Sequence, residues 1–373
     1  MTGIIGNTIS KFIPRDKTDQ QIVESGKNYF IVKIHTAQAS FTAPFYQKIN
    51  RLIVTSKIVL NHPILGTKPI NALQFSREVE KNTPQKLGTT KNLINFVPAI
   101  METVSISLDF LLDTHNRFAS LAKLINAGAF VTEISLGAGA AATAKTVSDI
   151  SQKLVDTFIP DPKQRTPILQ FTGDFNIPTK ELSNGYYVIL GTRNKEKPLP
   201  SASSKFEVKG DSLFVDGIQA TAWSYVILSV FSIDARGRSL SEGAVWEKKL
   251  REAEGRADVI EFDPLASEDD KKEEWKKCRG LIGEAMILLN NDINYLHDEA
   301  KNIYVNVAKY CNIKIFGKKT RLIPASAASI SEETRQDREF LGIPLDEDIE
   351  ISLNRYNRQV EETNLLIQKE KLL

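Results

Sequence analysis

Residues 267–312 read SEDDKKEEWKKCRGLIGEAMILLNNDINYLHDEAKNIYVNVAKYCN, and this stretch decides the helical part of the fold. Its apolar residues recur every three or four positions, which places them in one stripe along a helix. Ser267 is placed to cap the N-terminus, and the acidic residues after it suit the positive end of the helix dipole. The pattern predicts one nearly continuous helix over residues 268–310. Its stripe comprises Trp275, Cys278, Ile282, Ala285, Leu289, Ile293, Leu296, Ala300, Ile303, Val307 and Tyr310.

A helix of this length needs a partner along its whole stripe. At 1.5 Å per residue it would extend roughly 60–70 Å, more than most helices of globular domains. The last segment, residues 349–367, offers a second stripe of only about half that length. Because exposed apolar stripes mark interfaces, we expect the chain to self-associate or to dock into an assembly through its C-terminal helices. The expected interface residues are Trp275, Ile282, Leu289, Ile293, Leu296, Ile303, Val307 and Tyr310.

The first 262 residues carry strand patterns. Residues 61–92 are polar and punctuated by Pro and Gly, which predicts loops with one short element at 70–80. Hairpin signals without strand–helix alternation favour antiparallel sheets packed as sandwiches. The predicted fold is therefore α+β, with two tandem antiparallel β-sandwich-like modules and a C-terminal long-helix extension. Runs rich in β-branched residues and bounded by turn formers predict strands at 28–35, 50–60, 103–112, 167–172, 186–192, 205–208, 212–215 and 222–233.

Three regions are expected along the chain. Residues 1–145 form an N-terminal β-rich module with flanking helices, residues 146–262 a second β-rich module, and residues 263–373 the helical region. A chain of 373 residues is long enough for two or three separate cores. A hydrophobic content of 42% and a charged content of 25% are typical of a globular protein. The net charge of +2 is too close to neutral to predict nucleic-acid binding.

The two β-rich modules carry short matches that suggest a duplication. Residues 12–17 (FIPRDK) resemble residues 158–163 (FIPDPK). An apolar strand followed by Asp-x-x-x-Arg also occurs twice. It runs from Asp113 to Arg117 and again from Asp234 to Arg238. No long stretch aligns, so the question of duplication stays open. For the Asp and Arg of each match, a local pair at the strand-to-helix turn is favoured over a catalytic role.

Cysteine usage bears on the compartment. Cys278 and Cys311 both fall on the expected helix. Roughly 50 Å would separate them along a straight helix, so they are not expected to form a disulfide with each other. Free cysteines favour a reducing compartment, and the N-terminal residues lack the apolar run of a signal peptide. We expect a cytoplasmic protein, with peripheral membrane association as the alternative.

One small-residue segment admits two functional interpretations. Residues 137–142 (GAGAAA) superficially match a dinucleotide-binding fingerprint, but no βαβ series surrounds them, and close helix packing is favoured. Residues 124–144 carry a single charge, at Glu133, which raises the question of membrane contact. The segment is mostly Ala and Gly, whose burial in lipid gains little, so a membrane span is not favoured.

Two other motifs are weak. Residues 210–213 (GDSL) match the motif of GDSL esterases, but they lie in mid-chain between two β segments and lack the Asp-x-x-His partner. A hairpin turn is therefore expected. Residues 317–320 (GKKT) end like a phosphate-binding loop, but position 312 is Asn where that motif requires Gly. The four histidines show no metal-ligand spacing, and we predict no cofactor and no metal site.

No motif identifies a family, and the leading hypothesis rests on architecture. It is a non-enzymatic structural or adaptor protein whose partners are itself or other proteins of an assembly. The first alternative is a membrane-active protein, pore-forming or toxin-like, that uses residues 124–144 at a membrane surface. The second is a hydrolase of unrecognised type, which a Ser212→Ala activity screen would address.

Overall fold

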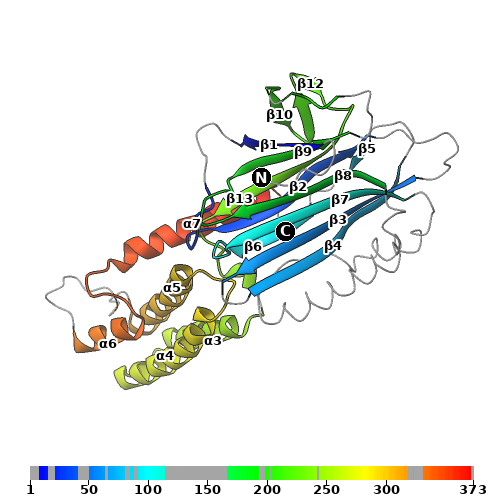
Figure 1. Ribbon diagram of the computed structural model, residues 1–373. Helices are drawn as coiled ribbons and strands as arrows, with labels where there is room; N and C mark the ends of the chain where they lie inside the picture. Colours follow the sequence, from blue (N-terminus) through cyan, green and yellow to red (C-terminus); the bar gives the residue numbers. More distant parts are fainter. Residues whose placement is uncertain are drawn as a thin grey trace. The chain divides into compact units, whose positions relative to one another are not determined.

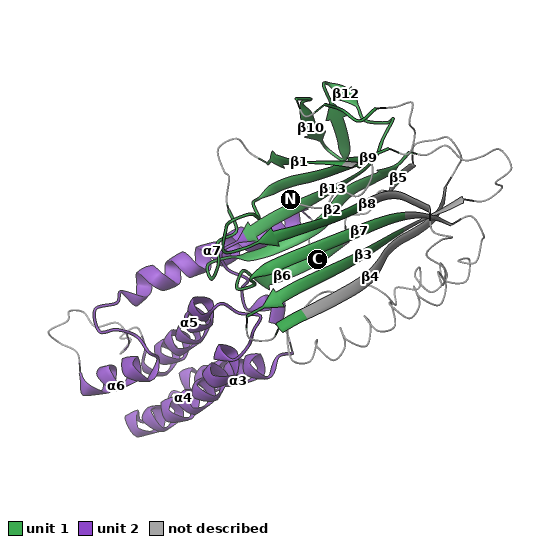
Figure 2. Cartoon of the chain, viewed as in Figure 1, with its two compact units in different colours: residues 1–232 green, residues 233–373 purple. Residues whose placement is uncertain are grey.

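The chain divides into two compact units, Met1–Ser232 and Ile233–Leu373 (Figure 2). The fold is mixed α+β, with antiparallel sheets in the first unit and helices in the second. The computed structural model describes residues 8–15, 22–40, 50–63, 66–79, 85–87, 91–113, 166–192, 198–201, 203–241, 243–317, 322 and 331–370. The small-residue segment 124–144, the motif at 137–142 and Arg117 lie outside these ranges.

The described residues of the first unit form three sheets (Figure 1). The largest has the order β1-β9-β13-β2-β5, with β6 also paired to β2: β1 (Thr8–Pro14), β9 (Gly185–Gly191), β13 (Ser224–Ile233), β2 (Tyr29–Ala39), β5 (Gln85–Leu87) and β6 (Lys91–Pro98). A second has the order β4-β3-β7-β8: β4 (Gly66–Val79), β3 (Asn50–His62), β7 (Thr103–Asp113) and β8 (Thr166–Asn176). The third is a meander of β10 (Phe206–Lys209), β11 (Ser212–Val215) and β12 (Ile218–Gln219).

The core of the first unit centres on β13. All ten of its residues are buried, including the polar Ser224 and Ser229. The meander packs its apolar side chains on β9 and β13, where Phe206 and Leu213 join Tyr225 in one buried cluster. Full burial of a strand means that both of its faces are covered, whereas a half-exposed strand would alternate.

The prediction of loops over residues 61–92 is wrong. Strands occupy most of that range: β4 pairs with β3 from Asn50↔Val79 to His62↔Gly66, and parts of β3, β5 and β6 fall within the range as well. Gly66 adopts a positive φ of 69° at the turn, which only glycine accepts without strain. Pro69 lies within β4 and removes one backbone donor, which is tolerated because β4 is an edge strand of its sheet. Proline was therefore an unreliable signal for a loop here.

Strand pairing crosses the boundary expected at residue 145. β7 pairs with β8 from Thr103↔Asn176 to Leu112↔Thr166, and β1 pairs with β9. The segments expected to form two consecutive modules thus share sheets within one unit. The second unit begins at Ile233, so it also includes residues 233–262, which were expected in the second module.

The second unit is built of helices, and we call it the helical unit. A short 3-10 helix, η2 (Ser239–Ser241), precedes the first of them. Ser267 caps α4 as predicted: its Oγ accepts a hydrogen bond from the Asp270 amide at 3.1 Å, and its amide donates to Asp270 Oδ2 at 2.9 Å. The helices that the structure describes are α3 (Val245–Glu261), α4 (Glu268–Asn290), α5 (His297–Phe316), α6 (Glu332–Phe340) and α7 (Ile349–Glu370).

The prediction of one continuous helix over residues 268–310 is wrong. α4 ends at Asn290 and α5 begins at His297, so the stripe folds back on itself. The Asn291 side chain donates to the Ile287 carbonyl at 2.8 Å, and Asp292 Oδ1 accepts the Asn294 amide at 3.0 Å. These side chains compete with the helical backbone for its hydrogen bonds. Four Asn or Asp residues among positions 290–294 were the turn signal that the apolar stripe concealed.

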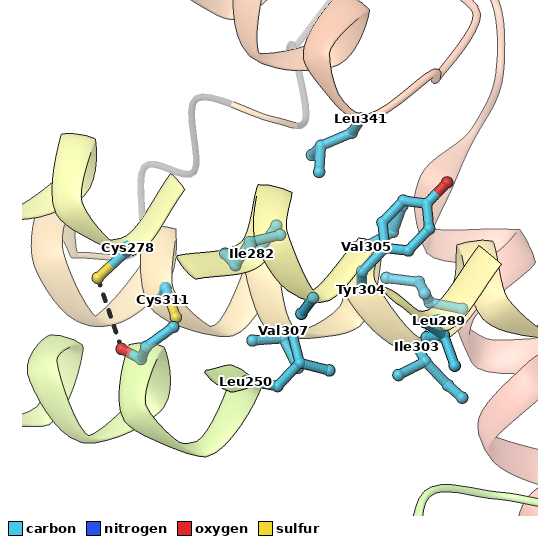
Figure 3. Close-up of a cluster of buried hydrophobic side chains, with 14 of the residues drawn as sticks. Leu250, Cys278, Ile282, Leu289, Ile303, Tyr304, Val305, Val307, Cys311 and Leu341 are labelled. Carbon is cyan, nitrogen blue, oxygen red and sulfur yellow. Dashed lines mark hydrogen bonds between the residues drawn. The ribbon is translucent and has the colours of Figure 1, made fainter. Parts of the chain in front are cut away.

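The fold-back brings the two cysteines together. Cys278 on α4 and Cys311 on α5 lie side by side in the core of the helical unit (Figure 3). The Cys311 thiol is hydrogen-bonded to Cys278, which lowers the pKa of Cys278 and raises that of Cys311. Cys278 in turn donates to the Ala253 carbonyl at 3.5 Å. The expected separation of roughly 50 Å, which assumed one straight helix, is therefore wrong.

The neighbouring thiols give a direct test of the helical hairpin. Mild copper–phenanthroline oxidation of the folded chain should link Cys278 to Cys311 within one molecule, because the thiols already touch. Peptide mapping would show the cross-linked pair and the loss of two hydrogen atoms. The same treatment in urea, where the thiols are apart, serves as the control. Failure to cross-link in the folded chain, with both thiols reactive, would contradict the hairpin.

Candidate functional site

Most of the predicted interface residues lie in the core of the helical unit. Trp275, Ile282, Leu289, Leu296, Ile303 and Val307 are buried, and all but Leu296 belong to one apolar cluster. Ile293 lies half-buried in the turn between α4 and α5. Tyr310 is the one among the eight that is exposed, at 37%. The chain itself therefore covers most of the stripe, and a partner surface has to be sought among other residues of this unit.

Three large apolar side chains are exposed together where α3 meets the connection to α4. Val259 is 73% exposed, Phe262 80% and Leu265 89%. We call these three residues the apolar tip. Phe262 is the C-cap of α3, and the Leu265 amide donates to Asp263 Oδ1 at 2.9 Å, which fixes the turn that follows. The connection is short and hydrogen-bonded, so it holds its apolar side chains outward.

Acidic residues surround the apolar tip. The segment 258–270 contains six Asp or Glu residues and no Lys or Arg. Lys314 of α5 pairs with Glu261 at 2.6 Å, and Lys271 pairs with Glu268 at 3.4 Å. Each pair cancels one carboxylate, so the six carboxylates and these two lysines together carry a net charge of −4 (six negative and two positive charges). We call this set the acidic collar: Asp258, Glu261, Asp263, Glu268, Asp269 and Asp270.

The pKa of Tyr310 reflects the negative charge of the acidic residues near it. Its hydroxyl donates to Asp258 Oδ1 at 2.7 Å. That hydrogen bond to a carboxylate raises the pKa of Tyr310 to about 12, with smaller contributions from burial and from Glu254 and Glu261. A phenolate there would face three carboxylates, so the neutral hydroxyl is retained.

A pocket of about 500 Å³ adjoins Tyr310 between α3, α5 and α7. Its apolar wall includes Ile303, Val307 and Tyr356. Two of the predicted interface residues, Ile303 and Val307, therefore line it together with Tyr310. Arg238 lies in the pocket, and Glu254 accepts two hydrogen bonds from it, at 2.6 and 2.7 Å. The remaining lining is polar: Ser239, Asn306, Asn357, Glu361 and Asn364, with Val360.

Arg238 does not leave a free positive charge in this pocket. Glu247 accepts a third hydrogen bond from its Nε, at 2.6 Å, and also pairs with Arg251 at 2.8 Å, so Glu247 and Glu254 together balance two guanidiniums. Glu361 adds a further carboxylate at the rim. The pocket therefore joins the acidic collar in favouring cationic over anionic groups.

The GDSL segment forms a hairpin turn, as predicted. β10 and β11 are paired around Gly210 and Asp211, with Lys209 opposite Ser212. The Lys86 ammonium donates to Ser212 Oγ at 2.7 Å and pairs with Asp211 at 2.8 Å. An ammonium that donates to a hydroxyl does not act as its general base. The contacts of Ser212 are those of a structural turn.

No family model and no curated protein matches the sequence. Within the described ranges, no three His, Cys, Asp or Glu side chains are grouped to hold a metal ion. Over those same residues, no helix combines the length and the apolar character that crossing a membrane requires. The proposed function therefore rests on the exposure and charge of the described residues.

Proposed function

We propose that the chain is a non-enzymatic structural or adaptor protein that docks onto another protein through the apolar tip of its helical unit. The observation that carries the proposal is the joint exposure of Val259, Phe262 and Leu265 beside a well-packed core. Single exposed apolar residues are ordinary, but a group of them is not. Covering such side chains gains about 25 cal/mol per Å² of apolar surface, which favours a bound partner.

The surface proposed here replaces the one expected from the sequence. Docking through the stripe would require Ile282 or Leu289 to reach a partner, and both are already buried against helices of the same unit. Tyr310 remains part of the proposed surface because it is exposed and bonds to Asp258 of the acidic collar. The proposal thus keeps the helical unit as the docking element and moves the contact to its end.

Site-specific photo-cross-linking tests this proposal. A benzophenone amino acid placed at Leu265 should give one protein adduct of defined mass in host cells, and the adduct should disappear in the Phe262→Ser background. The same group at Asn354, an exposed residue of α7, is the matched control and should not give that adduct. A tip that yields no protein adduct, or the same adducts as Asn354, would contradict the proposal.

The membrane-active alternative draws on the same observation. A loop that exposes Phe262 and Leu265 also offers apolar side chains to a lipid surface. Co-sedimentation with neutral and anionic vesicles distinguishes the alternatives: the adaptor proposal expects no binding that depends on Phe262. Vesicle binding that is lost in Phe262→Ser would favour the membrane-active alternative.

Two further proposals concern the architecture: sandwich packing of the sheets and an internal duplication. The complete burial of β13 supports a second layer packed against its sheet. Duplication would require the segment after Asp113 to superpose on the segment after Asp234. Arg238, expected to pair locally with Asp234, forms ion pairs with Glu247 and Glu254 of α3.

A further inference from the structure

Acidic residues of the helical unit extend from the pocket to the apolar tip, and one ammonium lies among them: Lys314 pairs with Glu261 and lies over the Tyr310 ring. Glu254, Asp258 and Glu261 follow one another at spacings of four and three, which places them on one face of α3. Glu254 lines the pocket, and Asp258 contacts Tyr310, which lines it too. Glu261 is the last residue of α3 and precedes Phe262 of the tip. The pocket and the tip are therefore parts of one surface.

Backbone charge adds to this field. α3 ends at Glu261, and the ion pair between Glu261 and Lys314 places the last turn of α5 beside it. The C-terminal ends of helices carry partial negative charge. The N-terminus of α4 contributes the opposite sign, but its own cap and first turn hold Glu268, Asp269 and Asp270. The end of the helical unit thus presents apolar side chains within a negative potential.

From this complementarity we infer that the occupant of the apolar tip is a basic segment of a partner protein that carries Lys or Arg together with apolar side chains. The inference rests on the proposed function and names the chemistry of its partner. Basic side chains face the acidic collar and the carboxylates of the pocket, while apolar side chains cover Phe262 and Leu265.

The same charges weigh against two other occupants. Two copies joined tip to tip would bring their acidic collars together, and like charges at an interface are unfavourable. A membrane surface rich in anionic lipid would be repelled by six carboxylates in the segment 258–270. A basic protein segment is the occupant that satisfies both the apolar and the charged parts of the surface.

The test measures binding of defined peptides to the full-length chain by fluorescence anisotropy. The first probe is a labelled helical peptide of Lys and Leu, which offers both positive charge and apolar side chains. A Glu–Leu peptide keeps the apolar content and reverses the charge, and a Lys–Ser peptide keeps the charge and removes the apolar content. The inference expects the Lys–Leu peptide to bind at least about tenfold more tightly than either of the others.

Paired variants locate the binding. Leu265→Ser should weaken binding of the Lys–Leu peptide about tenfold, and Ile287→Ser, an exposed residue of α4, should leave it unchanged. The double variant Asp263→Asn/Asp269→Asn should weaken binding a few-fold and reduce its salt dependence. Asn at position 263 keeps the acceptor for the Leu265 amide, so the turn is preserved. Glu339→Gln, an exposed residue of α6, is the charge control and should have no effect.

Several outcomes would overturn the inference. They are equal binding of the Glu–Leu and Lys–Leu peptides, binding that salt does not weaken, binding unaffected by Leu265→Ser, and preferential binding to phosphatidylserine vesicles. Self-association that Leu265→Ser abolishes would identify a second copy as the occupant and would also overturn it. If the Leu265 photo-cross-link persists in cells while the Lys–Leu peptide fails to bind, docking stands and only the partner's chemistry is wrong. If both fail, the proposed function fails as well.

Discussion

Ile282→Asp should abolish cooperative unfolding of the helical unit. Ile282 is fully buried in the core between α4 and its neighbouring helices (Figure 3). A lone carboxylate placed there loses its water and finds no cation, at a cost of at least several kcal/mol. Typical domain stability is only about 5–15 kcal/mol, so most of it would be lost. Urea unfolding followed by circular dichroism, together with limited proteolysis of residues 245–316, measures the effect.

The matched control lies on the same helix. Ile287 of α4 is 63% exposed, so Ile287→Asp should change the free energy of unfolding by no more than about 0.5 kcal/mol. Ile293, at the centre of the predicted stripe, lies half-buried in the turn, so Ile293→Asp should cost less than Ile282→Asp. Equal effects at Ile282 and Ile287 would contradict the assignment of the buried face.

Arg338→Met should destabilise the helical unit by about 3 kcal/mol, because it removes a fully buried charge that holds three carbonyl groups. Arg338 is 2% exposed and donates to the Leu322 carbonyl at 3.2 Å and to the Glu347 carbonyl at 2.6 Å. A further hydrogen bond reaches the Pro344 carbonyl at 2.5 Å. One side chain thus fixes the connection between α6 and α7. Methionine keeps the length of the side chain and removes all of its donors.

Arg335→Met on the same helix is the comparison for this substitution. Arg335 is exposed and makes a surface ion pair with Glu332 at 3.8 Å, so its loss should change stability by less than about 0.5 kcal/mol. In Arg338→Met, amide hydrogen exchange should also accelerate over residues 341–348, where the carbonyls of Pro344 and Glu347 lie. Stability that is equal in the two variants would show that the buried arginine does not hold this connection.

Local chemistry predicted some helical elements well. The cap at Ser267 and the buried positions of α4 followed from spacing alone, because a helix buries every third or fourth residue whether or not it ends early. The break at 291–296 did not follow, since the apolar period continued across the turn through Ile293 and Leu296. The cluster of Asn and Asp at 290–294 indicated the turn, but the apolar spacing, which extends over more residues, favoured a continuous helix.

Long-range pairing was beyond what the sequence offered. β7 was predicted as a strand, but its partner β8 is separated from it by more than fifty residues, and no local pattern names the partner. Only one short element, at 70–80, was predicted where β4 forms, because Pro69 and the flanking glycine indicated a loop, although an edge strand accommodates both. Strand existence depends on local residues, whereas sheet order depends on the whole fold.

The proposed site was the least predictable part. Val259, Phe262 and Leu265 show no exposure signal in a sequence, because apolar residues at a helix end normally pack inward. Their acidic neighbours were visible, but they were interpreted as favourable charges at the start of a helix. Only the packing of α3 and α4, which leaves these side chains outside the core, identifies them as a surface.

The native particle is the assembly in which the chain is isolated from its host. Amide hydrogen exchange on this particle tests docking through the apolar tip most directly. The chain isolated from its host under mild conditions is compared with the purified chain alone, and exchange is followed over residues 258–270. The account predicts slower exchange at 262–266 in the native particle, and faster exchange again when salt releases the partner. Identical exchange of this segment in both samples, with protection elsewhere on the helical unit, would contradict it.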